Sequence, residues 1–317
     1  MIKRKKTREV RIGNVMVGGD HAVTVQSMTT SKTHDVTATL KEVERLEEAG
    51  CHLIRITVPD QPAADALKEI KKRMNVPLIA DIHFNYRMAL EAVDAGADKI
   101  RINPGNIGGK KKVKEVLDKV KGANLPIRIG VNAGSLEKDL IEKYNFPTPE
   151  AMLESAKRHI DICRENDFHD IIVSMKASDV NLMMASYELF SEHYDYPLHL
   201  GVTEAGPAKS GTIKSSVGIG SLLSKGIGDT IRVSLTEDPV EEVHVGFEIL
   251  KSLGLASKGV TIVSCPTCGR LEVDLFKIAG EVEEELKDVK TPMTLALMGC
   301  AVNGPGEATH TDLGIAF

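Results

Sequence analysis

The sequence predicts an α/β protein in which a closed (β/α)8 barrel is followed by a small α+β domain. Short β-rich segments alternate with amphipathic helical segments along most of the chain, an order that is typical of a parallel sheet. Eight such segments precede residue 254, and eight β-then-α units in about 250 residues match the size of a closed barrel. The composition then changes, and three of the five cysteines gather near the C-terminus.

Composition and charge exclude several classes of protein. The 317 residues are 42% hydrophobic and 27% charged, as in an ordinary soluble globular protein. The net charge of −5 argues against a general nucleic-acid binder, which would be basic. The basic run Met1–Arg8 has no apolar segment after it, so it is neither a signal peptide nor a membrane span. We therefore expect a cytoplasmic protein with reduced cysteines.

The barrel begins after a predicted β-hairpin at Val10–Val17, where apolar residues alternate around Gly13-Asn14. A representative barrel helix is Gln61–Met74, whose apolar residues recur at helical spacing, and Val240–Leu253 is predicted as the last one. An open doubly wound sheet stays as the alternative, because periodicity does not show closure. The eight predicted strands are Ala22–Ser27, His52–Val58, Pro77–Ile82, Lys99–Asn103, Ile127–Val131, Asp170–Met175, Pro197–Val202 and Asp229–Leu235.

The second domain is predicted to span residues 254–317, without a long linker before it. It contains a helix near Leu271–Leu286 and a strand near Thr294–Met298. Its distinguishing feature is a C-x2-C pair, Cys265 and Cys268, followed by Cys300 beside a Gly-Pro-Gly turn.

These three cysteines indicate a metal site. A C-x2-C turn lets two thiolates converge on one centre, and no fourth cysteine in this stretch closes a tetrahedral zinc site. The best further ligand in the same turn is Glu307, a hard oxygen donor among soft sulfurs. A structural zinc site completed by a distant histidine and a redox disulfide stay as alternatives. Cys51 opens a predicted apolar strand and Cys163 lies in a predicted helix, and both are expected to be core or surface thiols without chemistry.

The predicted barrel strands end in polar residues, often at the period-two spacing that keeps one face of a strand. In a closed barrel, residues at the C-terminal ends of the strands form the active site. The set comprises Arg55, Thr57, Asp81, His83, Arg101, Asn103, Arg128, Asn132, Ser174, Lys176, His199, Thr203, Glu204, Arg232 and Ser234.

Cations dominate this set, and so many cations in one cavity are unfavourable unless anions neutralise them. Arginine forks match phosphate oxygens, so a diphosphate is the most economical ligand. For a single residue the alternative is an internal ion pair, such as Arg101 with Asp81. Gly206–Gly220, which is rich in Gly, Ser and Lys and leads into a helix, is a candidate phosphate-binding loop, although tight packing explains its glycines equally well. The insertion with Glu137–Tyr144 is expected to be a lid or an extra surface helix.

Several segments together resemble one family, the bacterial 4-hydroxy-3-methylbut-2-enyl diphosphate synthases, iron–sulfur enzymes of the non-mevalonate isoprenoid pathway. The similarity spans essentially the whole chain, and the last segment is the most specific. The segments are Val25-Gln-Ser-Met-Thr-Thr30, Ala80-Asp-Ile-His-Phe-Asn85, Arg101-Ile-Asn-Pro-Gly-Asn-Ile-Gly108, Arg128-Ile-Gly-Val-Asn132, Leu200-Gly-Val-Thr-Glu-Ala-Gly206, Ser264-Cys-Pro-Thr-Cys-Gly-Arg270 and Gly299-Cys-Ala-Val-Asn-Gly-Pro-Gly-Glu307.

The resemblance implies a TIM barrel followed by a small 4Fe-4S domain. It implies reductive ring opening and dehydration of 2-C-methyl-D-erythritol 2,4-cyclodiphosphate to the hydroxymethylbutenyl diphosphate. Asp81, Asn132 and Glu204 would then lie near the reacting carbons, with Glu204 as proton donor. The diphosphate would be held by Arg55, His83, Arg101, Arg128, Lys176 and Ser234, and the cluster by Cys265, Cys268, Cys300 and Glu307.

The resemblance also implies partners. Electrons would come from a reduced flavodoxin or ferredoxin, and the chain would form a homodimer with each cluster domain over the partner's barrel. Members of the family usually continue some tens of residues beyond Phe317, so the cluster domain is expected to be incomplete. Two other functions stay open. One is a phosphate-binding barrel transferase, resembling dihydropteroate synthase, with a structural zinc. The other is a metal-dependent interaction module on a barrel without activity.

Overall fold

The computed structural model describes residues 2–103, 107–257, 259–286, 289–300, 302, 306 and 308–317. The chain divides into two compact units, Met1–Leu253 and Gly254–Phe317. Each unit is described by itself.

The first unit is a closed barrel of eight parallel strands. The strands follow the order β8-β7-β6-β5-β4-β3-β10-β9, and a bridge between Val173 and Leu198 joins β8 to β9. This closure confirms the (β/α)8 prediction over the open sheet, and each predicted strand overlaps an observed one. The observed strands are β3 Thr24–Met28, β4 Leu53–Thr57, β5 Leu78–Asp81, β6 Lys99–Ile102, β7 Ile127–Asn132, β8 Ile171–Lys176, β9 His199–Leu200 and β10 Thr230–Ile231.

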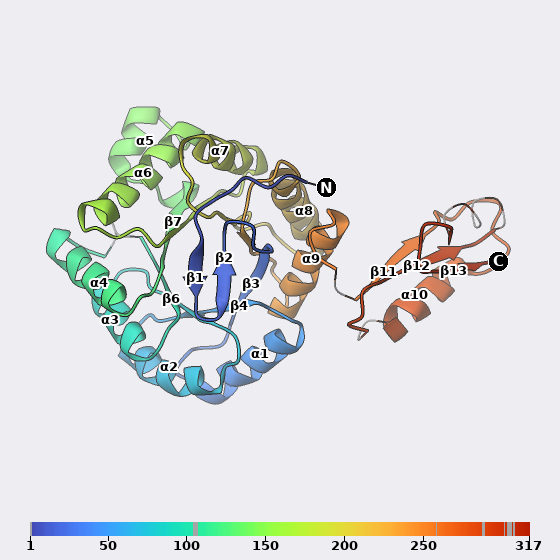
Figure 1. Cartoon of the computed structure of the whole chain (residues 1–317), viewed down its shortest axis with the longest axis horizontal. Coiled ribbons are helices and arrows are strands. Elements are labelled where there is room, and N and C mark those ends of the chain that lie inside the picture. Colours follow the sequence, from blue (N-terminus) through green and yellow to red (C-terminus); the bar gives the residue numbers. More distant parts are fainter. Residues whose placement is uncertain are drawn as a thin grey trace. The chain divides into compact units, whose positions relative to one another are not determined.

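Helices surround the barrel as an outer ring (Figure 1). Several begin at a side-chain cap: Asp60 accepts a bond from Ala63 N, and Thr148 accepts one from Ala151 N. Such caps satisfy backbone donors that the first helical turn leaves free. The helices of the ring are α1 Val36–Glu48, α2 Gln61–Arg73, α3 Tyr86–Asp94, α4 Lys110–Gly122, α6 Pro149–Glu165, α7 Val180–His193, α8 Ala208–Ser224 and α9 Pro239–Ser252.

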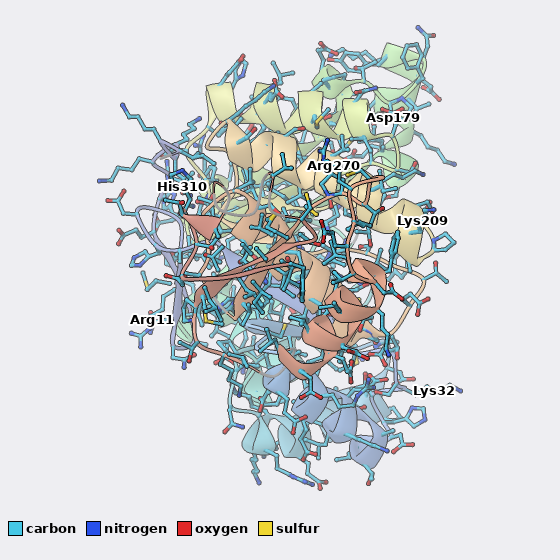
Figure 2. All side chains as sticks on the ribbon, turned by 90° about the vertical axis from the view of Figure 1, so that its right-hand side faces the viewer. Arg11, Lys32, Asp179, Lys209, Arg270 and His310 are labelled. Carbon is cyan, nitrogen blue, oxygen red and sulfur yellow. The ribbon has the colours of Figure 1, made fainter. Side chains whose placement is uncertain are left out.

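The predicted hairpin exists as strands β1 Val10–Ile12 and β2 Val15–Val17, and it lies across one end of the barrel (Figure 1). Its buried Val10, Ile12 and Val17 pack against residues near the starts of three barrel strands, Leu53, Ile79 and Ile172. The hairpin therefore closes the N-terminal end of the barrel. Three side chains from segments that follow β3, β8 and β9 lie on the opposite side from Arg11 of the hairpin (Figure 2): Lys32, Asp179 and Lys209.

The prediction that Gly206–Gly220 forms a loop is wrong, because most of this stretch belongs to helix α8. Phosphate binding by this stretch stays a prediction. Two glycines explain the misleading composition. A Cβ on Gly211 would lie 2.7 Å from Gly206 O, and one on Gly218 would lie 2.5 Å from Met183 Cε. Glycine at these positions thus serves close helix packing. The insertion after β7 is a 3-10 turn at Ala133–Ser135 and a short helix, α5 Lys138–Tyr144.

The second unit contains a three-stranded parallel sheet with one helix. The strands are β11 Val260–Ser264, β12 Met293–Met298 and β13 Leu313–Ala316, in that order, and the helix is α10 Leu275–Leu286. Leu275, Leu295 and Leu297 form its buried core. The sequence prediction included the helix and β12 but neither β11 nor β13. Among the described residues, no helix is long and apolar enough to cross a membrane.

The hairpin closure generates the first testable prediction. Ile12→Ala removes a fully buried side chain from the cluster between hairpin and barrel. We expect it to lower the free energy of unfolding by about 3 kcal/mol, through lost apolar burial and the cavity left behind. Arg11→Ala, on the exposed face of the same strand, is the control and should change it by less than about 0.5 kcal/mol. Urea denaturation measures both, and equal effects would contradict the closure.

Candidate functional site

Strand register directs the predicted site residues into the barrel. Asp81 pairs in register with Arg101, and Arg101 with Arg128. Asn132 pairs with Lys176 at the ends of β7 and β8. Because neighbouring residues in register point to the same face of a parallel sheet, these side chains share the interior. The alternation noted in the sequence thus places one polar set around the C-terminal half of the barrel.

Asp81 is the centre of an ionic cluster. Its carboxylate lies 3.2 Å from Arg101 Nη1, 3.5 Å from Arg55 Nε and 3.8 Å from His83 Nε2. Burial by itself raises the pKa of Asp81, but Arg55, Arg101 and His83 outweigh burial and hold this pKa at about 2. Asp81 is therefore ionised at neutral pH, and the ion pair of Arg101 with Asp81 exists.

Arg128 and Lys176 lie deeper, 1% and 7% exposed. Burial, followed by repulsion from neighbouring cations, lowers the pKa of each well below its usual value. Gly130 in β7 and Gly201 directly after β9 make room for the cationic groups of this interior. A Cβ on Gly201 would lie 2.7 Å from Lys176 Nζ, and one on Gly130 would lie 2.8 Å from Arg101 Nη2. The absence of a side chain at these two positions thus leaves the space that Lys176 and Arg101 occupy.

Arg232 is already neutralised. It forms a two-pronged ion pair with Glu242 of α9, with its Nη2 3.0 Å from Glu242 Oε1. Glu242 also accepts bonds from Ser27 Oγ and Leu235 N. Sequence reasoning missed Glu242 because it lies in the first turn of α9 and not at a strand end, so no strand-end pattern marks it.

Positive charge exceeds negative charge in the interior. Within the described part of the barrel, six lysine and arginine side chains interact with one another there, whereas two carboxylates, Asp81 and Glu242, contact them. Such an excess of basic groups is costly in a low-dielectric interior unless an anion completes it. The sixth basic residue, Lys99, was not among the predicted site residues, although the alternation Lys99-Ile-Arg101 is visible in the sequence. The six are Arg55, Lys99, Arg101, Arg128, Lys176 and Arg232.

The remaining barrel residues differ in exposure. Asn132 and Ser234 are half-buried, whereas Glu204, in the turn after β9, is exposed. Glu204 has a φ of +53°, in the left-handed region that side-chain-bearing residues rarely adopt. Such strain is concentrated at functional sites. His199, in contrast, is fully buried beneath the mouth.

The cysteine site lies at one edge of the sheet of the second unit. Cys265 follows β11 directly, and its N–H donates to Leu297 O at 3.1 Å, so it continues the ladder with β12. Cys300 lies two residues beyond the end of β12. The N–H of Gly299 donates to Cys265 Sγ at 3.3 Å. The side chains of Cys265, Cys268 and Cys300 are partly or fully exposed, so their thiols can bind a metal, whereas Cys51 and Cys163 are buried.

The predicted ligand Glu307 lies outside the described residues. Within the described part of the chain, no group of three or more His, Cys, Asp or Glu side chains is already arranged to hold a metal ion. The three thiolates nevertheless suit an iron–sulfur centre by donor type, and the N–H of Gly299 stabilises one of them.

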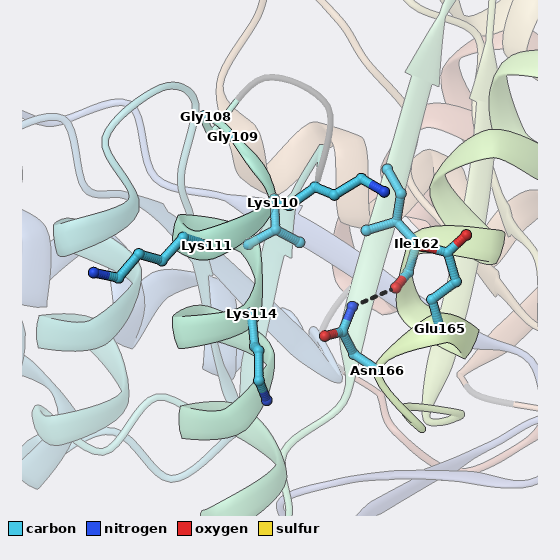
Figure 3. Close-up of a pocket in the computed structure, with 9 residues that line it drawn as sticks. Gly108, Gly109, Lys110, Lys111, Lys114, Ile162, Glu165 and Asn166 are labelled. Carbon is cyan, nitrogen blue, oxygen red and sulfur yellow. Dashed lines mark hydrogen bonds between the residues drawn. The ribbon is translucent and has the colours of Figure 1, made fainter.

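A pocket of about 590 Å³ lies elsewhere, between α4 and α6 on the outside of the barrel (Figure 3). Lys110, Lys111 and Lys114 line it from α4, and Ile162, Glu165 and Asn166 from α6. Asn166 Nδ2 bonds Ile162 O across one helix turn. None of the predicted site residues lines this pocket, so it is not the site that the strand ends build.

The Asp81 cluster generates a prediction. Asp81→Asn leaves Arg55 and Arg101 without their counter-ion, and we expect the free energy of unfolding at pH 7 to fall by about 3 kcal/mol. Because folding depresses the pKa of Asp81 to about 2, its contribution is complete above about pH 4 and is lost as the pH falls through 2. Denaturation at pH 7 and pH 2.5 should therefore show the variant converging on the parent in acid. The control Asp118→Asn, in an exposed pair with Lys114, should change little at either pH.

Comparison with known proteins supplies the family. The GcpE TIM-barrel domain matches residues 7–247, and the GcpE protein C-terminal domain matches residues 261–317. The chain is 60% identical over 316 residues to the 4-hydroxy-3-methylbut-2-en-1-yl diphosphate synthase (flavodoxin) of Geobacillus thermodenitrificans, covering 100% of this chain and 84% of the relative. Its identity to the enzyme of the same name from Bacillus mycoides is 58% over 316 residues, covering 100% of this chain and 87% of the relative.

Solved structures show the fold alone at this level of identity. The Yersinia pestis dihydropteroate synthase superposes with a TM-score of 0.54 at 16% identity, covering 78% of this chain and 98% of that one. The 3-dehydroquinate dehydratase of Geobacillus kaustophilus superposes with a TM-score of 0.55 at 14% identity, covering 80% and 99%. The full-length matches are decisive: the chain belongs to the GcpE family, together with the 4-hydroxy-3-methylbut-2-en-1-yl diphosphate synthases.

Proposed function

We propose that this protein reductively opens 2-C-methyl-D-erythritol 2,4-cyclodiphosphate and dehydrates it to (E)-4-hydroxy-3-methylbut-2-enyl diphosphate, in non-mevalonate isoprenoid biosynthesis. The observation that carries the proposal is the excess of buried basic groups in the barrel of a chain that is 60% identical, over 316 residues, to a synthase of that name. Two electrons and a proton enter. The ring-closing C–O bond breaks to release a free diphosphate end, and a hydroxyl group leaves as water.

The cationic interior supports the first half of this reaction. When the C–O bond breaks, negative charge grows on the departing diphosphate oxygen, and fixed cations stabilise it. Asp81 holds the side chains of Arg55 and Arg101 in place before the ligand arrives. We assign diphosphate binding to Arg55, His83, Arg101, Arg128, Lys176 and Ser234, on the barrel unit.

Glu204 supports the second half. A hydroxyl group leaves readily only when it receives a proton, and a carboxylic acid in the turn after β9 is suitably placed at the strand ends to supply one. Asp81 cannot serve as the donor, because its pKa of about 2 keeps it ionised. We therefore assign Asp81 to orienting the arginines, and Asn132, in register with Lys176, to positioning the substrate.

The second unit supports electron delivery. We assign Cys265, Cys268, Cys300 and Glu307 as ligands of a 4Fe-4S cluster in the unit Gly254–Phe317, with Glu307 outside the described residues. When bound, such a cluster supplies the two electrons one at a time. The N–H of Gly299 stabilises the thiolate of Cys265 by a hydrogen bond.

A reduced flavodoxin is the proposed electron source, because the 60% identical relative carries flavodoxin in its name; ferredoxin is the second candidate. The homodimer, with each cluster domain over the partner's barrel, and the cytoplasmic location stay predictions. The transferase alternative is not favoured, since the similarity to dihydropteroate synthase, at 16% identity, concerns the fold only.

The cluster assignment is tested by metal analysis. Protein purified without oxygen should contain about four irons and four acid-labile sulfides per chain, with a broad visible absorption that dithionite bleaches. Cys268→Ser should lose most of the iron. Cys163→Ala, which removes a buried thiol on α6, is the matched control and should keep it. One zinc per chain without a visible band would instead support the transferase.

The role of Glu204 is tested by two variants. Glu204→Gln should bind the cyclodiphosphate normally yet lose turnover by about 100-fold or more, because an amide cannot donate the proton. Glu204→Gly should be equally inactive but more stable by about 1 kcal/mol, since glycine adopts a φ of +53° without strain. Steady-state kinetics and thermal unfolding separate the two effects, with the exposed Glu241→Gln as control. Near-normal turnover in Glu204→Gln would refute the assignment.

A further inference from the structure

A second polar layer lies beneath the proposed diphosphate site. Lys99 begins β6, two residues before Arg101 on the same face, and it pairs in register with Ile79, which contacts the hairpin. His199 begins β9, and Gln26 lies in the middle of β3. All three side chains are 0% exposed. We call Lys99, His199 and Gln26 the inner layer; none of them belongs to the substrate-binding set assigned above.

The inner layer has polar atoms without partners. Within the described residues, no hydrogen-bond partner contacts Lys99 Nζ, His199 Nε2 or either amide atom of Gln26. The one polar side-chain contact of His199 is the weak one between Nδ1 and Thr230 Oγ1, at 3.3 Å, among these residues. Buried polar groups in native proteins are almost always satisfied. Several buried polar atoms without partners in one layer indicate that some of these groups gain a proton or a partner when a ligand binds.

The charged groups around the layer determine which way it changes. Lys99 faces Arg128 and Arg55, and His199 faces Arg128, Lys176, Lys99 and Arg55. Burial, and then these cations, lower the pKa of Lys99 and of His199 well below their usual values. The nearby carboxylates are committed elsewhere, Asp81 to Arg55 and Arg101, and Glu242 to Arg232. Tyr187 donates its hydroxyl to His199 O and so presents no negative charge.

We propose that Lys99 and His199 form a proton-accepting pair that takes up protons from the solvent when a cyclic diphosphate binds in the barrel mouth above them. The inference rests on the proposed function. The ligand brings two negative charges close to Arg55, Arg128 and Lys176, and it thereby offsets the repulsion that, after burial, disfavours the protonated forms of Lys99 and His199. Lys99 and His199 then gain positive charge only when the diphosphate is present. In the ligand-free protein they add no further repulsion with the neighbouring arginines.

Lys99 carries the first of these protons on Nζ, and buffer acid is the proton source. The cyclic diphosphate itself does not exchange protons near neutral pH, because each of its phosphorus atoms carries one strongly acidic hydroxyl group. Any net uptake therefore belongs to the protein. By linkage, uptake of one proton makes the Kd rise by about tenfold for each pH unit between the pKa of the free protein and the higher pKa of the complex.

The experiment is calorimetric titration of the intact, oxidised protein with the cyclodiphosphate, without reductant so that no turnover occurs. Runs at pH 7.5 in buffers of different ionisation enthalpy yield the number of protons taken up per ligand bound. Equilibrium dialysis measures the Kd independently from pH 6.5 to 8.5. We expect the parent protein to take up at least one proton and to bind more weakly as the pH rises.

Lys99→Met is the test variant, since methionine keeps the length of the side chain and removes the amine. It should take up about one proton fewer, show a flatter dependence of Kd on pH, and bind several-fold more weakly at low pH. Its Tm should not fall, because it removes an unsatisfied buried amine; Lys99→Gln serves as the second variant. Lys111→Met, which removes an exposed lysine of α4, is the control and should match the parent.

The outcomes separate this inference from the proposed function. Binding without proton uptake in the parent, or undiminished uptake in both Lys99 variants, overturns the proton-accepting pair and leaves the proposed function intact. Absence of binding by dialysis overturns the two together. Reduced uptake in the Lys99 variants with unchanged uptake in Lys111→Met supports the pair, and a purely structural role of Lys99 would not produce that difference.

Discussion

The excess of buried positive charge inside the barrel is the constraint on which the other features depend. Six basic side chains gathered around two carboxylates repel one another, and burial together with this repulsion lowers the pKa values of several of them. Asp81 and Glu242 divide these residues into those that have a carboxylate partner and those that have none among the described residues. Asp81 pairs with Arg55 and Arg101, Glu242 pairs with Arg232, and Arg128 and Lys176 form no ion pair with a carboxylate within the described part of the barrel.

The scaffold meets this constraint with small backbone features. Glycines at positions 130 and 201 leave the space that Arg101 and Lys176 occupy, and a side chain at either position would displace a cation. The hairpin closes the opposite end of the barrel with apolar residues, which keeps water away from the charged interior on that side. Glu204 holds a strained conformation at the other end. The packing of the barrel thus holds basic side chains close together although they repel one another.

The second unit uses the same device of parallel strands that end at a common edge. β11 and β12 are in register from Val260 with Met293 to Ser264 with Leu297. Cys265 and Cys300 therefore follow the ends of neighbouring strands. The N–H of Gly299 donates to Cys265 Sγ, although 34 residues separate the two in the sequence. The second unit contributes cysteine thiols at the ends of its strands, and the barrel contributes buried arginine and lysine side chains. The reaction of the family's synthases needs both electrons and the binding of a diphosphate.

The sequence by itself determined the barrel, its hairpin, the strand-end residues and the cysteine motif, because alternation, turn residues and ligand spacing are local patterns. It also determined the family. Only the tertiary structure decided which cations are neutralised, since the partner of Arg232 lies on the helix that follows. It also placed Lys99 and His199 beneath the mouth and turned the glycine-rich stretch into helix α8. Burial and charge neighbours arise from contacts between distant segments, and no local pattern encodes them.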